Sequence, residues 1–201
     1  MYYTVEIKGI RALIMHNGTA GLDTRSPAKI EMAEITKKRG SNRTVADDAR
    51  LRQLECQTAL WLDESGSPTI PGGAVRAVIE TGARKLRQGP QVREGLIVDS
   101  IDEFIYDKKK LGTTVSELGK SAQLTLAVVV ERKRILRTRA KFDTWGLRFT
   151  VEVDDELVDK QQLATWLDIG GRRIGIGDWR PERSGTYGRF EVVSIGETKR
   201  K

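Results

Sequence analysis

Residues 63–76 read Asp63-Glu64-Ser65-Gly66-Ser67-Pro68-Thr69-Ile70-Pro71-Gly72-Gly73-Ala74-Val75-Arg76, a turn that leads into a helix. Asp, Ser, Gly and Pro crowd its first six positions, which is the composition of a turn. Beyond the turn, side chains recur at the spacing of one buried helical face, at Val75, Val78, Ile79, Gly82 and Leu86. Charges recur on another face at i,i+4 spacing, at Arg76, Glu80 and Arg84. The stretch therefore predicts an amphipathic helix.

Strands are expected on both sides of this helix in the chain. Strict alternation predicts them at 3–8, 124–130 and 145–153, and a last strand is expected at 187–195. A second amphipathic helix follows Asp159, which with Gln162 forms an N-terminal cap. Two helices interleaved with strands predict an α+β fold, an RRM-like or ferredoxin-like sheet with helices on one face. The other face of such a sheet stays open.

Two insertions are expected within a single RRM-like domain that covers residues 1–201. The first, 17–68, begins as a long polar loop from Asn17 to Arg43 and continues as a helix capped by Thr44 and Asp47. The second, 96–121, mixes short apolar pieces with charge and is expected to be an irregular insertion or a hairpin. Long loops in compact domains are usually functional.

The composition of the 201 residues limits the function classes. Lys and Arg number 35 against 28 Asp and Glu, which gives a net charge of +7 and a pI near 9.6, so the surface attracts polyanions. One cysteine and one histidine exclude a disulfide framework and a His-rich or thiolate metal centre, so no metal or cofactor is expected. The sequence has neither a signal peptide nor an apolar run of membrane-spanning length. A cytoplasmic protein without membrane contact is expected.

Residues 131–142 form the densest basic segment, with six cations and one acid. Arg137, Arg139 and Lys141 recur at period two, so an extended strand points all three the same way. Such a row can follow a phosphate backbone, and Phe142 and Trp145 can offer stacking surfaces to bases. The alternative is a solvated strand edge, where cations discourage aggregation.

Residues 170–190 form a glycine-rich segment with five arginines. Glycines let a backbone approach a ligand closely, and its amides can then hold phosphates. Trp179 beside Arg180 is a further candidate for stacking on a base. The segment matches neither a dinucleotide fingerprint nor a Walker loop. The alternative is a plain helix-to-strand loop whose glycines only relieve turn geometry.

These segments together resemble the RAMP superfamily, the family of CRISPR effector backbone subunits. Residues 69–76 resemble the family's I-P-G-S-S-hydrophobic-K-G helix opening, and 63–68 resemble the D-x-x-G-x-P turn before it. The segment 170–190 resembles the C-terminal glycine-rich loop, with matches at Gly175, Gly177, Gly185 and Gly188. Between them the family order R…F…W…F…V is present at Arg139, Phe142, Trp145, Phe149 and Val151.

The resemblance implies an RRM-like core with a thumb-like insertion, assembled side by side along a single strand. The implied partners are single-stranded RNA or DNA, copies of the chain itself and other effector subunits, in a CRISPR system or in a phage or mobile element. Arg76 and the glycine-rich loop would face the nucleic-acid backbone. Gly72-Gly73-Ala74 replaces the usual Ser pair, and Gln57 stands where target-cutting relatives carry an aspartate, so no cleavage is expected.

The candidate nucleic-acid-binding residues share positive charge, an aromatic ring or a glycine backbone. They are Lys37, Lys38, Arg39, Arg43, Arg76, Arg132, Arg134, Arg137, Arg139, Lys141, Phe142, Trp145, Arg172, Arg173, Gly175, Gly177, Trp179, Arg180 and Arg183. One alternative is a RAMP-type endoribonuclease with His16 as general acid or base, or with Asp23. Another is a basic interaction protein that meets an acidic partner without binding nucleic acid.

Overall fold

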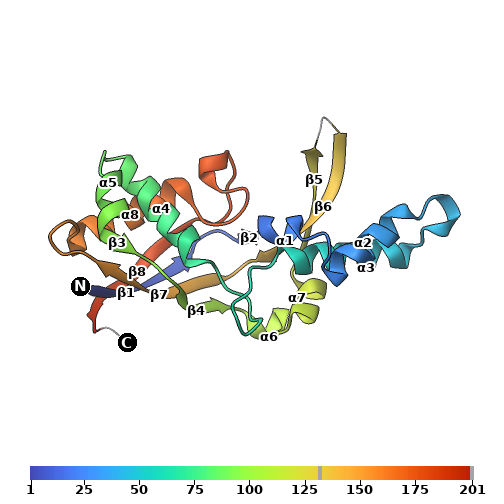
Figure 1. The fold of residues 1–201 in the computed structure, drawn as a ribbon, viewed down its shortest axis with the longest axis horizontal. Coiled ribbons are helices and arrows are strands. Elements are labelled where there is room, and N and C mark those ends of the chain that lie inside the picture. Colours follow the sequence, from blue (N-terminus) through green and yellow to red (C-terminus); the bar gives the residue numbers. More distant parts are fainter. Residues whose placement is uncertain (131–132, 200–201) are drawn as a thin grey trace. The chain divides into compact units, whose positions relative to one another are not determined.

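The computed structural model describes residues 1–130 and 133–199. The chain divides into two compact units (Figure 1). Unit 1 contains Met1–Ile14, Thr69–Asp107 and Phe142–Lys201, and unit 2 contains Met15–Pro68 and Lys108–Lys141. The chain therefore passes between the units four times.

Unit 1 is built on an antiparallel sheet in the order β3-β7-β1-β8, in which β4 also pairs with β7. Its strands are β1 (Tyr2–Gly9), β3 (Leu96–Ile97), β4 (Ile101–Tyr106), β7 (Trp145–Val153) and β8 (Phe190–Thr198). Its helices are α4 (Gly72–Arg84), α5 (Gly89–Gly95), α8 (Lys160–Ile169), η2 (Gly170–Ile174) and η3 (Pro181–Arg183). The order strand-helix-strand-strand-helix-strand confirms the expected α+β, ferredoxin-like fold.

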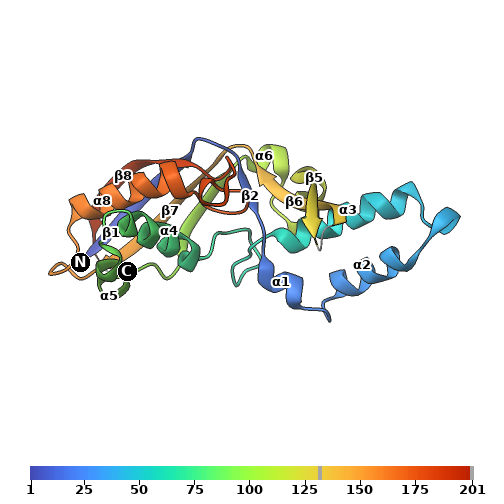
Figure 2. The ribbon, with the colours of Figure 1, turned by 90° about the horizontal axis from the view of Figure 1, so that it is seen from above.

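Helices α4 and α8 lie over the same face of this sheet (Figures 1 and 2). Tyr3, Val5 and Ile7 of β1 are buried on that face, as their alternation predicts. At Gly82 of α4, an added Cβ would lie 2.4 Å from the carbonyl oxygen of Trp166 in α8. The two helices therefore approach closely because the stripe of α4 carries a glycine there. The cap at Asp159 is present, since its side chain accepts from the backbone N–H of Gln162.

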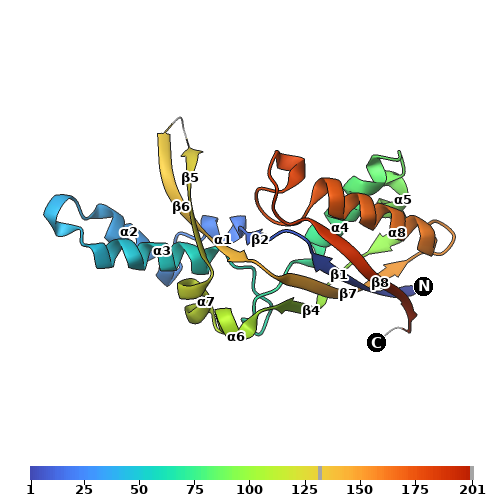
Figure 3. The same cartoon turned by 180° about the vertical axis from the view of Figure 1, so that it is seen from behind.

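Unit 2 combines helices with a two-stranded hairpin (Figure 3). Its helices are α1 (Gly18–Leu22), α2 (Pro27–Lys37), η1 (Gly40–Asn42), α3 (Val45–Ala59), α6 (Lys108–Leu111) and α7 (Val115–Ser121). The hairpin consists of β5 (Gln123–Val130) and β6 (Lys133–Phe142). In β2 (Leu13–Met15), the first two residues belong to unit 1 and Met15 belongs to unit 2. Thr44 and Asp47 form the expected capping box of α3. None of the helices in 1–130 and 133–199 is long and apolar enough to cross a membrane.

The insertions differ from the prediction in two places. Between Asn17 and Arg43 the expected long loop is wrong, because α1, α2 and η1 lie there. Ser26 and Pro27 begin α2, but only Ile35 of that helix is buried, so its periodicity is too weak to read. In the segment 96–121, β3 and β4 extend the sheet of unit 1 beside β7 instead of forming a hairpin.

Candidate nucleic-acid interface

The net positive charge of the chain lies in unit 2. That unit holds 18 Lys and Arg against 10 Asp and Glu, a surplus of eight. Unit 1 holds 17 against 18 and is close to neutral. Affinity for a nucleic-acid backbone depends on clustered cations, so unit 2 is the electrostatic candidate.

The open face of the sheet in unit 1 is not a positively charged surface. Glu6 of β1 stands opposite Arg148 of β7, which lies 3.7 Å from it and 3.3 Å from Glu103 of β4. Thr150 on the same strand donates to Asp102 at 2.9 Å. Arg148 is therefore already balanced by two acids, and this surface repels phosphates more than it attracts them.

The hairpin of unit 2 carries cations on both of its faces. Arg137 and Arg139 stand opposite Leu126 and Leu124 in the β5–β6 register, which puts all four side chains on one face. Arg134 belongs to the other face and is exposed. The predicted period-two row therefore has the strand geometry that it needs for Arg137 and Arg139. Arg132 lies outside the described residues.

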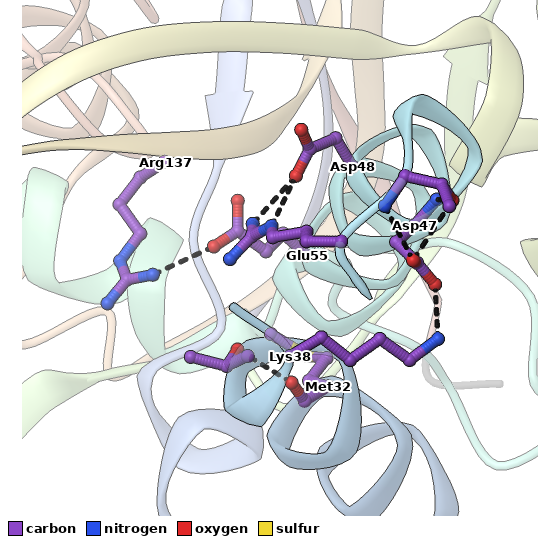
Figure 4. Close-up of polar contacts among 9 residues, drawn as sticks. Met32, Lys38, Asp47, Asp48, Glu55 and Arg137 are labelled. Carbon is purple, nitrogen blue, oxygen red and sulfur yellow. Dashed lines mark hydrogen bonds and ion pairs between the residues drawn. The ribbon is translucent and has the colours of Figure 1, made fainter. Parts of the chain in front are cut away.

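Arg137 is held by a buried carboxylate (Figure 4). Its Nη1 donates to Oε1 of Glu55 at 2.9 Å, and the backbone N–H of Thr138 donates to Oε2 at 2.8 Å. Glu55 is 7% exposed, whereas the side chain of Arg137 is 44% exposed. The carboxylate thus ties β6 to α3 and occupies one end of a guanidinium that reaches the surface.

Helix α3 also neutralises cations at the end of α2 and beyond it (Figure 4). Lys38 donates to Asp47 at 2.7 Å, and Arg43 donates to Asp48 at 2.7 Å. The hydrogen bond from Lys38, together with those from Thr44, lowers the pKa of Asp47 to about 2. Lys37 and Arg39 are exposed and form no ion pair or hydrogen bond with side chains of the described part of the chain. These two are the cations of the predicted group that can meet a ligand directly.

Two predicted contact residues belong to the core of unit 1 instead. Phe142 is fully buried against Phe104 and Tyr106, with ring centroids 5.1 and 5.2 Å away. Trp145 is 3% exposed, and its Nε1 donates to the carbonyl oxygen of Arg11 at 2.8 Å. Neither ring has a face for a base, so both predictions are wrong.

Arg76 supports the backbone of unit 1. Its Nε donates to the carbonyl oxygen of Leu96 at 2.9 Å, and its Nη2 donates to those of Val92 and Arg93 at 3.3 and 3.1 Å. The guanidinium therefore satisfies carbonyl groups at the end of α5. Its expected contact with a phosphate backbone is replaced by these three internal ones.

The glycine-rich segment forms a tight loop whose amides donate within the protein. Gly175 N–H donates to Gly170, Ile176 N–H to Gly188, and Asp178 N–H to Ile14. Gly177 has φ +85°, and a Cβ there would lie 2.3 Å from the carbonyl oxygen of Ile14. The loop geometry alone requires glycine at that position, and the Gly175 amide that was expected to hold a phosphate already donates to Gly170.

The arginines of this loop fall into two groups. Arg172 pairs with Asp168 at 2.9 Å, and Arg180 pairs with Glu182 at 2.7 Å. Arg173 and Arg183 are exposed, with no ion pair to the residues that the structure describes. Trp179, at φ +51° and 36% exposed, lies beside Tyr187 with centroids 6.4 Å apart. Trp179 is the aromatic candidate that keeps an accessible surface.

The residues of the enzyme alternative flank α1 in unit 2. His16 is exposed just before the helix. Asp23 ends it and accepts from the backbone N–H of Arg25 at 3.1 Å. Within 1–130 and 133–199, no three His, Cys, Asp or Glu side chains come together as a metal site. Burial raises the pKa of the Cys56 thiol to about 12, so this thiol stays protonated.

Two features of unit 2 are not predictable from the local sequence pattern. Glu55 carries no local signal, because its partner Arg137 lies 82 positions further along the chain. The lysine run of α6, Lys108 to Lys110, is visible in the sequence. It lies in the segment 96–121, which was expected to be an irregular insertion or a hairpin. It adds further exposed positive charge to the unit that already holds the surplus.

Comparisons with known proteins agree with the fold. No protein-family model matches the chain, and a search of curated proteins finds no match. Among solved structures, the chain is similar to one in the cryo-EM structure of the Type III-B Cmr-beta bound to cognate target RNA, at a TM-score of 0.51 and 11% identity. The match covers 97% of this chain and 59% of that one, so this chain spans little more than half its length. At this identity the likeness shows that the two share a fold.

Proposed function

We propose that the chain is a non-catalytic protein that binds single-stranded RNA or DNA through unit 2 and assembles with further copies along the strand. The observation that carries the proposal is the segregation of charge, a surplus of eight cations in unit 2 against none in unit 1. The similar solved chain belongs to a complex described as bound to target RNA, which supports a role on RNA. Other effector subunits are the partners that this likeness favours.

The exposed cations Lys37, Arg39 and Arg134 provide the test. None of them forms an ion pair with the described residues, so their removal leaves none of the described acids uncompensated. Fluorescence anisotropy with labelled single-stranded RNA, single-stranded DNA and duplex, across a salt series, measures their contribution. Each phosphate contact to a single strand contributes about 0.7 to the slope of log K against log salt. The triple alanine variant should lose roughly 100-fold in affinity at 0.1 M salt and about 2 in slope.

A matched control removes three exposed lysines of unit 1. Lys8, Lys85 and Lys160 lower the net charge by the same amount without touching unit 2. Their triple alanine variant should bind within about threefold of the wild type, because none of the three lysines belongs to the proposed site. Equal losses from the two triples would contradict a site in unit 2. Longer oligonucleotides should bind several copies cooperatively.

The absence of catalysis is part of the proposal and has its own test. Asp23 ends α1, and His16 lies just before its N-cap residue Asn17. Incubation of the protein with labelled RNA, with and without Mg²⁺, should leave the RNA intact. Cleavage that Asp23→Ala or His16→Ala abolishes, with RNA binding retained, would establish the endoribonuclease alternative instead.

A further inference from the structure

Three cations that the sequence assigns to phosphate binding are paired with acids of a single helix, α3 (Figure 4). Asp47 holds Lys38, Asp48 holds Arg43, and Glu55 holds Arg137. The three acids differ in accessibility. Asp48 is 45% exposed and Asp47 is also the partner in the capping box, whereas Glu55 is 7% exposed. The pair at Glu55 is therefore the one that solvent and salt weaken least.

Glu55 is fixed by two bonds that point to different parts of β6. One oxygen accepts from the Arg137 guanidinium and the other from the backbone N–H of Thr138, a residue that is itself buried. A carboxylate with both oxygens engaged cannot turn aside when a phosphate approaches. A strand that reaches Arg137 must therefore compete with a charge-assisted bond that is already formed.

We infer that Glu55 withholds Arg137 from the bound strand and so limits the affinity of unit 2 for polyanions. This inference rests on the proposed function and concerns the regulation of the same surface. Arg137 lies in the basic row and is 44% exposed, so a ligand can reach it, but its charge is balanced from inside the unit. Unit 2 then binds through Lys37, Arg39 and Arg134, and Glu55 acts as a positioning residue that sets how many cations take part.

Glu55→Gln tests the inference directly. Glutamine has the same length and its oxygen can still accept from Thr138, but it carries no charge to hold the guanidinium. The variant should bind single-stranded RNA about fivefold more tightly at 0.1 M salt, with a slope steeper by about 0.7. The matched control is Glu34→Gln on α2, an exposed acid with no ion pair in the described chain. It removes the same charge and should leave the slope unchanged.

The double variant Glu55→Gln/Arg137→Ala separates withholding from a structural role. Both charges of the pair are gone, so neither remains uncompensated. If Glu55 withholds Arg137, the double variant binds with wild-type affinity and slope, and the gain of Glu55→Gln disappears. A double variant that binds about fivefold more weakly than wild type would show that Arg137 already contacts the strand, and would overturn the inference even if Glu55→Gln alone failed to fold.

Retention on heparin distinguishes this inference from the proposed function. Heparin is a polyanion, so a released guanidinium delays elution whether or not RNA is the natural ligand. Later elution of Glu55→Gln than of Glu34→Gln, without any RNA binding in the wild type, would support the inference and reject the proposed function. Elution of both at the same salt concentration, with folding intact by circular dichroism, would reject the inference.

Discussion

Unit 1 and unit 2 differ in the contacts that stabilise each of them internally. Among the described residues, 27 of the buried apolar side chains belong to unit 1 and 10 to unit 2. The buried aromatic rings of the described chain all lie in unit 1. In unit 2, α2 is joined to α3 by a double hydrogen bond from Arg50 to Glu31 and by the pair of Lys38 with Asp47. Unit 1 therefore has the larger apolar core, and in unit 2 ion pairs add to a smaller one.

This difference explains why arginines and aromatic residues have different roles in the two units. In unit 1, an aromatic ring or an arginine is drawn into the interior or onto backbone carbonyls, as Trp145 and Arg76 are. In unit 2, cations outnumber acids by eight, and Lys37, Arg39 and Arg134 are exposed. The net positive charge therefore lies in unit 2, the unit with fewer buried apolar side chains.

The largest expected effect is a difference in stability between the loss of a buried tryptophan and the loss of one on an exposed loop. Trp145→Ala should destabilise unit 1 by about 3–5 kcal/mol, because it removes a buried ring and leaves a cavity. Trp179→Ala, on the exposed loop, should cost less than about 1 kcal/mol. Urea unfolding followed by circular dichroism measures both. Similar losses for the two variants would mean that Trp179 also serves the core.

A smaller effect is expected at the charge pair of unit 2. Arg137→Ala should destabilise that unit by about 1–3 kcal/mol, because it leaves the buried carboxylate of Glu55 without its cation. Adding Glu55→Gln should recover most of the loss. Hydrogen exchange at the Thr138 amide reports the free energy of opening. If the single and the double variant exchange alike, the pair does not stabilise unit 2.

The smallest expected effect is a pH dependence of the link between α2 and α3. The pKa of Asp47 is lowered from 3.8 to about 2, so its contribution to stability is complete above pH 4. That contribution is lost as the pH falls from 3.8 towards 2, because the unfolded state then binds the proton more tightly. The stability difference between wild type and Asp47→Asn should shrink over this window. A constant difference would exclude Asp47 as the titrating group.

The sheet, the two amphipathic helices and the caps could be predicted because each is written in local spacing. Alternation in β1 and β7, the stripe of α4 and the capping boxes at Thr44 and Asp159 depend on residues within a few positions of one another. Helix α2 could not be predicted in the same way. Its partner contacts are ion pairs with α3, and these leave no apolar period in the sequence.

The candidate site was harder to predict, because charge and aromaticity do not reveal where a side chain points. Phe142 and Trp145 follow the basic row in the chain, yet they enter the core of unit 1. The row itself was predicted on one face of a strand, but Glu55, which engages Arg137, comes from a helix 82 positions earlier. Pairing across such a separation is a property of the fold and not of local pattern.

The pairing of β1 has a consequence for the order in which the chain folds during synthesis. Its neighbours are β7 and β8, at Trp145–Val153 and Phe190–Thr198, whereas unit 2 ends at Lys141. At roughly 5–20 residues per second, the ribosome completes unit 2 before β1 meets its first neighbour, a delay on the order of ten seconds. For that time the backbone N–H and C=O groups of β1 and its apolar face have no partner strand, and this exposes the nascent chain to aggregation. Unit 2 is itself complete only at Lys141, four residues before β7 begins, so it reaches its full set of strands near the end of that wait.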